Sequence, residues 1–307
     1  MKPLYAFGEL LVDALHQQGV VEDGLAIPGA LFYPGGAPAN VAVAAARLGV
    51  KSHFIGQVGR DRFGPYLKQA LAHYGVDTRY LRSTDAPTPL ALVSLNDQGR
   101  PDFRFYRSGS ADLLLPAHKL PSPSEFEPGV VHVASNTLTE VDIRRVHLGF
   151  VDRCLDAGNL ISFDVNLRLG LWPGGNNYRE PVKAMLTRAD VIKVNREELA
   201  LLWETDAEQK FLELAFEHRA QAVFITDGAD SAEVVTRQGR HSQQPPKVEV
   251  VDVTAAGGAF CGAVIAALCE PAEPDWAAML ERAVRAGSFA VAKRGAFPSL
   301  PTSADLA

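Results

Sequence analysis

The segment VVDVTAAGGAFCGAVIAAL, Val250–Leu268, carries the strongest fold signal in the chain. It predicts a strand ending at Asp252, a turn of small residues, and a long apolar helix that begins near Gly257. The small side chains at 255–258 leave the first amides of that helix open, and such amides suit a phosphate because the helix dipole adds to them. Tight packing of the helix on a strand would explain the same small residues equally well.

Outward from this segment, runs of strand length alternate with runs of helical period. Strands are expected at Leu4–Phe7, Ser52–Val58, Val130–Ala134, Leu160–Asp164, Val191–Val194, Ala222–Thr226 and Glu233–Val235. Further helices are expected at Asn40–Leu48, Tyr66–His73, Asp142–Asp156, Tyr178–Thr187, Asp206–His218 and Trp276–Ala292. The alternation predicts a single α/β domain over residues 1–307, with a doubly wound, mostly parallel sheet flanked by helices.

Two regions do not fit a parallel sheet. Leu90–Leu95 and Asp102–Tyr106 are β-rich runs joined by NDQGRP, which predicts a hairpin, and Leu25–Tyr33 is a second extended segment. We expect residues of about 12–35 and 88–108 to form a small antiparallel β-flap. Such a flap would cover the carboxyl ends of the parallel strands, where ligands of these sheets bind.

Composition excludes several classes of partner. The 307 residues carry 30 Lys and Arg against 36 Asp and Glu, a net charge of −6, which argues against binding nucleic acid or anionic membrane. Cys154, Cys261 and Cys269 lack disulfide or metal spacing and are expected to be buried thiols in a reducing compartment. No signal peptide or 18-residue apolar run is visible, so we expect a cytoplasmic protein, and RQGRHSQQPP, Arg237–Pro246, is expected to be an exposed loop.

A second glycine-containing segment, YPGGAPANVAVAAARLG, spans Tyr33–Gly49. Gly35 and Gly36 lead into a helix that starts near Asn40, and glycines allow a ligand to approach the backbone closely. The free amides at the helix start would face the same ligand. A plain turn capped by Asn40 is the alternative.

Polar side chains also follow two of the predicted strands. In SFDVNLRLGLW, Ser162–Trp172, side-chain alternation points Asp164, Asn166 and Arg168 to one side at a strand end, which is a typical ligand position. An ordinary ion pair between Asp164 and Arg168 is the alternative reading.

In ADVIKVNREE, Ala189–Glu198, a strand ends at Asn195 and Glu198 falls in the first turn of the next helix. A carboxylate there suits a hydrated divalent cation. Helix capping by Asn195 is the alternative.

Taken in order, these motifs resemble the ribokinase-like (pfkB) carbohydrate kinases over nearly the whole chain. GGAPANVAVAAARLG is similar to the family's N-terminal signature, and DVTAAGGAF to its C-terminal one, usually D-T-T-G/A-A-G-D-A-F. The segments most similar to bacterial fructokinases are GELLVD, PTPLALVSL, FRFYRSGSADLLL, SFDVNLRLGLW and GAFPSLPT. The resemblance implies a ribokinase-like fold with a β-lid and transfer of the γ-phosphoryl of Mg-ATP to a sugar hydroxyl. For a fructokinase, the product is fructose 6-phosphate.

The resemblance also implies roles for individual residues. The implied sugar-binding residues are Asp13, Gly35, Gly36, Asn40, Phe103, Phe105 and Arg107. The implied nucleotide-binding residues are Asn195, Glu198, Thr226 and Gly228. The implied anion hole consists of Ala255, Ala256 and Gly257, with Arg168 facing sugar or phosphate. Glu198 would hold magnesium through water, and Asp252 with Thr254 a monovalent cation such as potassium. Packing within the flap would explain Phe103 and Phe105 equally well.

One position departs from the family pattern. The family's general base is the Asp of G-A-G-D, and this chain has Gly258 there, with Asp252 six residues back and no acid immediately after it. General-base catalysis is worth about 10²–10⁴ in rate, so we expect retained binding with strongly reduced turnover. The open alternatives are a sugar- or nucleotide-binding pseudo-kinase, an active enzyme carrying a substitution, and a sibling kinase acting on 2-keto-3-deoxygluconate or a nucleoside. A homodimer through the lid is also expected.

Overall fold

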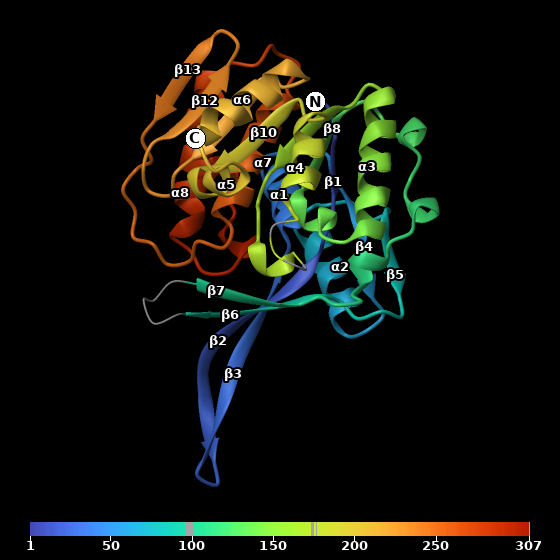
Figure 1. Cartoon of the computed structure of the whole chain (residues 1–307). Helices are drawn as coiled ribbons and strands as arrows, with labels where there is room; N and C mark the ends of the chain where they lie inside the picture. The colour runs from blue at the N-terminus through green and yellow to red at the C-terminus, as the bar shows by residue number, and fades with distance from the viewer. Residues whose placement is uncertain (96–100, 173–174, 176, 307) are drawn as a thin grey trace.

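A nine-stranded sheet with strand order β13-β12-β11-β10-β9-β8-β1-β4-β5 forms the centre of the molecule (Figure 1). The computed structural model describes residues 1–95, 101–172, 175 and 177–306. The strands are β1 (Leu4–Phe7), β4 (Ser52–Gly59), β5 (Leu81–Thr84), β8 (Val130–Ala134), β9 (Leu160–Asp164), β10 (Val191–Asn195), β11 (Ala222–Thr226), β12 (Ala232–Thr236) and β13 (Gly239–Gln243). Neighbours from β5 to β11 run parallel, whereas β12 and β13 are antiparallel additions at one edge.

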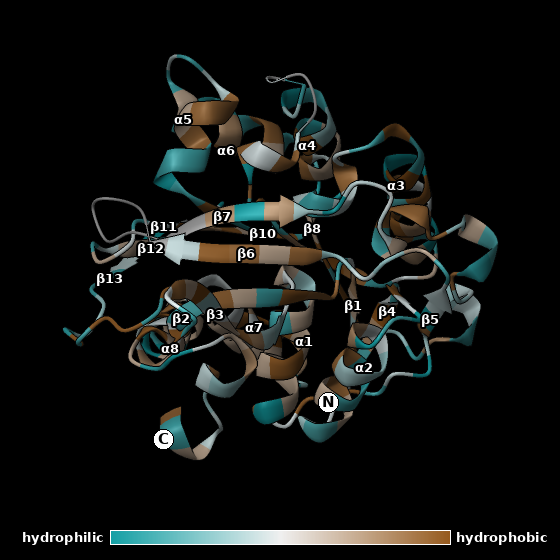
Figure 2. Ribbon diagram, turned by 90° about the horizontal axis from the view of Figure 1, so that it is seen from below, coloured by the Kyte–Doolittle hydropathy of each residue, from teal (hydrophilic) through white to brown (hydrophobic). Residues whose placement is uncertain are grey.

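Helices cover both faces of this sheet (Figure 2). One face carries α1 (Ala37–Arg47), α2 (Phe63–His73), α7 (Ala256–Leu268) and α8 (Trp276–Val291). The other carries α3 (Val141–Asp156), α4 (Arg179–Leu186), α5 (Arg196–Leu202) and α6 (Ala207–Glu217). Short 3-10 turns lie at Ala111–Leu114, Ala117–Lys119, Pro123–Glu125, Ser135–Leu138, Leu169–Leu171, Phe297–Ser299 and Ala304–Leu306. The doubly wound α/β prediction is confirmed.

Each central strand contributes to two cores. In β1, Leu4 and Ala6 belong to the core beneath α1 and α7, and Tyr5 and Phe7 to the core beneath α3. All four are buried, which explains why the parallel strands appear in the sequence as unbroken apolar runs. Among the described residues, no helix is long and apolar enough to cross a membrane.

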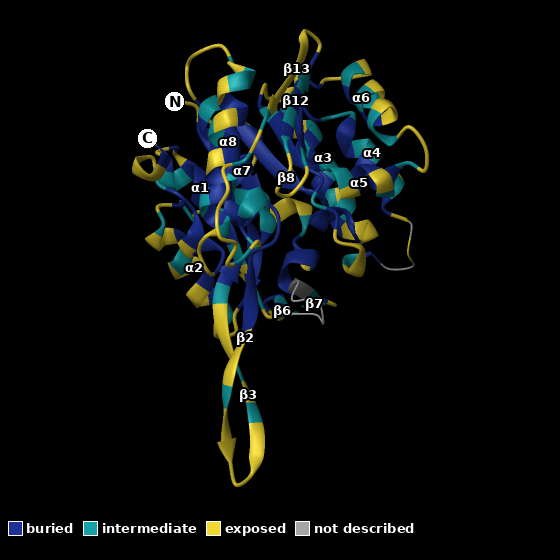
Figure 3. Ribbon diagram, turned by 90° about the vertical axis from the view of Figure 1, so that its left-hand side faces the viewer, coloured by how far each residue is buried: buried dark blue, intermediate teal, exposed yellow. Residues whose placement is uncertain are grey.

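A second sheet forms the predicted flap, which we call the lid. It consists of β2 (Leu11–Glu22), β3 (Leu25–Gly35), β6 (Leu90–Leu95) and β7 (Pro101–Tyr106), in the order β3-β2-β6-β7. The β2–β3 and β6–β7 pairs are antiparallel, but β2 and β6 run parallel, so the lid is a mixed sheet. The β2–β3 hairpin projects far from the domain and is exposed over its outer half (Figures 1 and 3). The predicted turn between β6 and β7 lies outside the described residues.

Two local predictions are wrong. Gly239–Gln243, within the stretch expected to be a loop, is β13, an edge strand whose polar side chains look like loop sequence. No strand ends at Asp252: the backbone N–H groups of Val251 and Asp252 donate instead to the carbonyl of Val291 at the end of α8. These bonds satisfy the backbone without a neighbouring strand, and the apolar side chain of Val251 stays 56% exposed.

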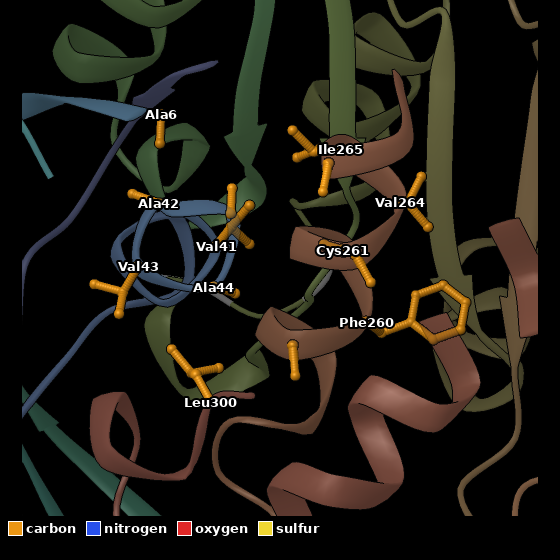
Figure 4. Close-up of a cluster of buried hydrophobic side chains, with 14 of the residues drawn as sticks. Ala6, Val41, Ala42, Val43, Ala44, Phe260, Cys261, Val264, Ile265 and Leu300 are labelled. Atoms are coloured by element: carbon orange, nitrogen blue, oxygen red, sulfur yellow. The ribbon is translucent and has the colours of Figure 1, made fainter. Parts of the chain in front are cut away.

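Helices α1 and α7 pack closely, with small side chains between them (Figure 4). A Cβ built on Gly262 would lie only 2.3 Å from the Cβ of Ala44, so the two helices approach through a glycine. This contact brings the N-termini of both helices to the same end of the domain, beneath the root of the lid.

Candidate active site

A cavity of about 870 Å³ lies where the lid, the ends of β9–β11 and the N-termini of α1 and α7 meet. Sequence reasoning foresaw many of its lining residues. The foreseen ones include Asp13, Gly36, Asn40, Phe103, Phe105, Asp164, Asn166, Arg168, Asn195, Glu198, Thr226, Gly228, Thr254, Ala256, Gly257 and Gly258. The structure therefore brings together residues that are up to 245 positions apart in the sequence, from Asp13 to Gly258.

The lid contributes Asp13, which is only 4% exposed. It lies on β2 against Gly35 of β3, where a Cβ would come within 2.1 Å of the Asp13 Oδ2, so only glycine leaves room for the carboxylate. Burial raises the pKa of Asp13 to about 7, and the nearby Asp252 and Glu9 carboxylates act in the same direction. The rings of Phe103 and Phe105 lie parallel at 6.2 Å on β7 and also line the cavity.

Several buried oxygens at this end of the cavity have no donor. Glu9 Oε1 accepts the Ala37 amide at 2.8 Å and the Asn136 Nδ2 group at 2.9 Å. Glu9 Oε2, Asn40 Oδ1 and Asn136 Oδ1 have no hydrogen-bond partner in the described parts of the chain. An unpaired buried acceptor is costly, so this set suits a ligand rich in hydroxyl donors. Burial also raises the pKa of Glu9.

The opposite end of the cavity suits an anion. Ala256 and Gly257 open the first turn of α7, with no acidic residue in that turn. Lys193, on β10, places its Nζ 3.7 Å from where a Cβ of Gly257 would be, and 3.1 Å from Asp164 Oδ1. Burial lowers the pKa of Lys193, but Asp164 and Glu198 outweigh this and hold it above its usual value. A charged ammonium thus lies beside free helix amides.

Glu198 connects two strand ends. Its Oε2 accepts the Asn195 amide at 2.8 Å and its Oε1 the Leu167 amide at 2.9 Å, while Asn195 Oδ1 accepts the Glu198 amide at 2.8 Å. Asn195 is therefore a helix cap, as the alternative reading held. Burial raises the pKa of Glu198. The Leu167 bond holds the loop of Asn166, a cavity residue with a positive φ of 37°.

Gly258 lines the cavity and also packs against α1. A Cβ built on it would lie 2.6 Å from the Cβ of Asn40, and the three nearest atoms all belong to Asn40. A side chain at position 258 would therefore require α1 to shift.

Some foreseen residues do not line the cavity. Arg107 is buried with its Nε 2.7 Å from Asp112 Oδ2 and its Nη1 2.7 Å from the Asn136 carbonyl, so it lies behind the cavity lining next to the sugar end. Asp252 also lies outside the lining. Its Oδ1 accepts hydrogen bonds from the Thr254 amide and hydroxyl, and its Oδ2 accepts one from the Gly295 amide.

Gly35 and Ala255 also lie behind the lining, the first against Asp13 and the second as the N-cap of α7. The alternative reading of an Asp164–Arg168 ion pair is wrong, because Asp164 pairs with Lys193 instead.

Not every cavity residue was identified from the sequence, and Glu9, Asn136 and Lys193 are three that were not. Lys193 had a usable signal, since it is a charge inside the apolar run VIKVN and shares the Asn195 face of that strand. Glu9 had a weaker one, an acid two residues after the end of the buried strand β1. Asn136 sits in a 3-10 turn, where no periodicity marks it.

Comparison with known proteins gives a consistent result. The model of the pfkB family carbohydrate kinases matches residues 1–303. The chain is 35% identical over 309 residues to probable fructokinase-5 of Arabidopsis thaliana, covering 98% of this chain and 95% of that protein. The fructokinase of Xylella fastidiosa with bound ATP superposes with a TM-score of 0.91 at 34% identity, covering 100% of this chain and 97% of that one. A double mutant of the Vibrio cholerae O395 fructokinase, in a fructose, ADP and potassium ion bound form, gives 0.86 at 32% identity, covering 100% and 97%.

Proposed function

The chain belongs to the pfkB family of carbohydrate kinases, and from that premise we propose that it transfers the terminal phosphoryl group of ATP to fructose, giving fructose 6-phosphate. The observation that carries the proposal is the difference in chemistry between the two ends of one cavity. One end holds buried oxygens that lack donors, and the other holds a helix N-terminus beside a buried lysine. A sugar fits the first end and a triphosphate the second.

At the sugar end, the carboxylate of Asp13 and the amide oxygen of Asn40 accept hydrogen bonds from sugar hydroxyls. Phe103 and Phe105 cover the apolar face of the ring from the lid. Glu9 and Asn136 accept hydrogen bonds from further sugar hydroxyls. They use the side-chain oxygens that have no partner among the described residues. Because Asp13 sits on the lid and Asn40 on α1, sugar binding joins the lid to the domain.

At the nucleotide end, the amides of Ala256 and Gly257 hold phosphate oxygens, and Thr226 and Gly228 line the path from the end of β11. Magnesium arrives with the nucleotide as part of the substrate and neutralises phosphate charge. Both carboxylate oxygens of Glu198 already accept hydrogen bonds from backbone amides. A magnesium ion that contacts Glu198 through a water molecule leaves those bonds intact. Asp252 likewise keeps its backbone bonds if a potassium ion approaches it.

Gly258 makes slow turnover the expected behaviour. Phosphoryl transfer depends mainly on positioning and charge stabilisation, which this cavity retains, but the proton of the attacking hydroxyl lacks its usual acceptor. Binding of sugar and nucleotide without turnover is the second candidate function, and the same glycine favours it.

Two measurements on the native chain test these readings. ADP formation from Mg-ATP is followed with fructose, 2-keto-3-deoxygluconate and a nucleoside, and fructose binding is measured by calorimetry. Fructose-dependent ADP formation supports the proposal, and a preference for another acceptor contradicts the choice of sugar. Fructose binding with no ADP formation favours the binding protein. No binding of any sugar contradicts both.

We also propose that the lid pairs with a second copy of this chain. The outer half of the β2–β3 hairpin exposes Val20 at 57%, Val21 at 72% and Leu25 at 67%. Exposed apolar side chains on two unpaired strand edges favour association with another sheet. Light scattering at micromolar concentration tests this: a dimer that dissociates in Val21→Asp supports the pairing, and a native monomer rejects it.

The proposed location is the cytoplasm, with no nucleic-acid partner. The support is the net charge of −6 together with three buried free cysteines. Cell fractionation of the tagged native chain checks the location, and recovery in a membrane or secreted fraction would contradict it.

A further inference from the structure

Lys193 is a cation whose position the family motifs of this chain do not explain. Its Nζ lies 3.1 Å from Asp164 Oδ1 and 3.7 Å from the Cβ position of Gly257, in the first turn of α7. The lysine side chain is 12% exposed and that of Asp164 only 4%, so the lysine is the more accessible member of the pair. Both residues line the cavity.

The Lys193 ammonium has more hydrogen-bond donors than its ion pair with Asp164 uses. Among the described residues, the single ion pair formed by Lys193 is the one with Asp164, and an ammonium carries three donors. The second carboxylate nearby, Glu198, already accepts two backbone amides. The remaining Lys193 donors can therefore serve a ligand in the cavity without breaking any bond of the protein.

The free amides of α7 and this ammonium converge on one point. Helix amides attract any anion, but a point charge on a flexible stem adds strength where the phosphate charge is greatest, at the terminal group of a triphosphate. We propose that Lys193 binds the terminal phosphate of the nucleotide and that Asp164 is the positioning residue that holds it there. The inference rests on the proposed function, since it requires ATP in this cavity.

The proposal predicts selectivity between two nucleotides. If Lys193 contacts only the terminal phosphate, its loss weakens ATP binding and leaves ADP binding nearly unchanged. If Lys193 served stability alone, its loss would weaken the binding of both nucleotides equally or of neither. Removing Lys193 by itself leaves Asp164 buried and unpaired, which can unfold the chain. The informative variant is therefore Asp164→Asn with Lys193→Met, which removes both charges.

The experiment is calorimetric titration with Mg-ATP and Mg-ADP, which needs no turnover. The native chain, the single variant Lys193→Met and the double variant are compared. Lys68→Met is the matched control, since Lys68 is an exposed lysine on α2 outside the cavity. Circular dichroism melts show which variants are folded at the titration temperature.

We expect the native chain to prefer ATP, and the folded double variant to lose roughly tenfold to a hundredfold of that preference, as for a charged hydrogen bond. Lys68→Met should keep it. A double variant that retains the ATP preference, or loses both nucleotides equally, overturns the role of Lys193 while the proposed function stands. A native chain that binds neither nucleotide overturns both.

Discussion

Gly258 packs directly on Asn40: a Cβ at position 258 would lie 2.6 Å from the Cβ of Asn40, closer than side chains tolerate. The residue that would complete the family signature is absent, and its Cβ would require α1 to shift. Asn40 is itself a cavity residue with a buried oxygen that lacks a donor. Restoring an acid at 258 therefore affects the catalytic group and the sugar end of the site together.

The first prediction concerns Gly258→Asp with Gly258→Ala as its matched control. Both add a Cβ that α1 must accommodate, which costs about 1–3 kcal/mol of unfolding free energy. Only the Asp variant adds a proton acceptor, so we expect its turnover with fructose to rise about 10²–10⁴-fold over the native chain. Urea unfolding and ADP release measure the two effects. Equal turnover in the two variants would show that position 258 does not supply the base.

The second prediction tests the close approach of α1 and α7. Gly262→Ala places a Cβ 2.3 Å from the Ala44 Cβ, and such overpacking against a helix should cost about 1–3 kcal/mol. Gly149→Ala on α3 is the control, because its Cβ would meet only an ordinary contact at 3.7 Å. Replacing that helical glycine should stabilise the chain by about 0.5–1 kcal/mol. Thermal unfolding that moves both variants in the same direction would contradict the packing argument.

The third prediction concerns the carboxylate that joins two strand ends. Glu198→Ala removes the acceptor of the Leu167 and Asn195 amides, and each buried N–H left unpaired costs about 1–3 kcal/mol. We therefore expect about 2–5 kcal/mol of lost stability and weaker nucleotide binding, because the loop of Asn166 loses its anchor. Glu197→Gln, an exposed neighbour, should change stability by less than about 0.5 kcal/mol. Similar unfolding midpoints for the two variants would refute this anchoring role.

The fold was predictable because its signals are local. Strand β1 is buried on both faces and the helices follow a clear period, so type and order emerge from the sequence alone. β13 was missed because an edge strand can be wholly polar. The supposed strand at Val250–Asp252 failed because backbone groups found their partner in Val291, a contact set by tertiary structure.

The candidate site was predictable where glycine and polar residues mark strand ends and helix starts, as at Gly36 and Asn195. It was not predictable where a side chain is recruited by a distant partner. Arg107 looked like a ligand, but Asp112 and the Asn136 carbonyl hold it away from the cavity. No motif assigned a role to Lys193, but the tertiary structure places its Nζ beside Gly257. Pairings of this kind depend on the tertiary fold, which spacing along the chain does not encode.

The last prediction uses Asp13, whose pKa is raised by burial to about 7. Between about pH 4 and pH 7 the folded chain keeps a proton on Asp13 that the unfolded chain releases. The free energy of unfolding therefore falls as the pH rises from about 4 to 7. The shift of about three pH units corresponds to about 4 kcal/mol. Asp13→Asn cannot titrate, so its unfolding free energy relative to the native chain should rise across that range and then level off. Urea unfolding at pH 4, 5.5, 7 and 8 measures it, and a constant difference for Asp13→Asn would mean that the Asp13 carboxyl ionises at its ordinary pH in the folded chain.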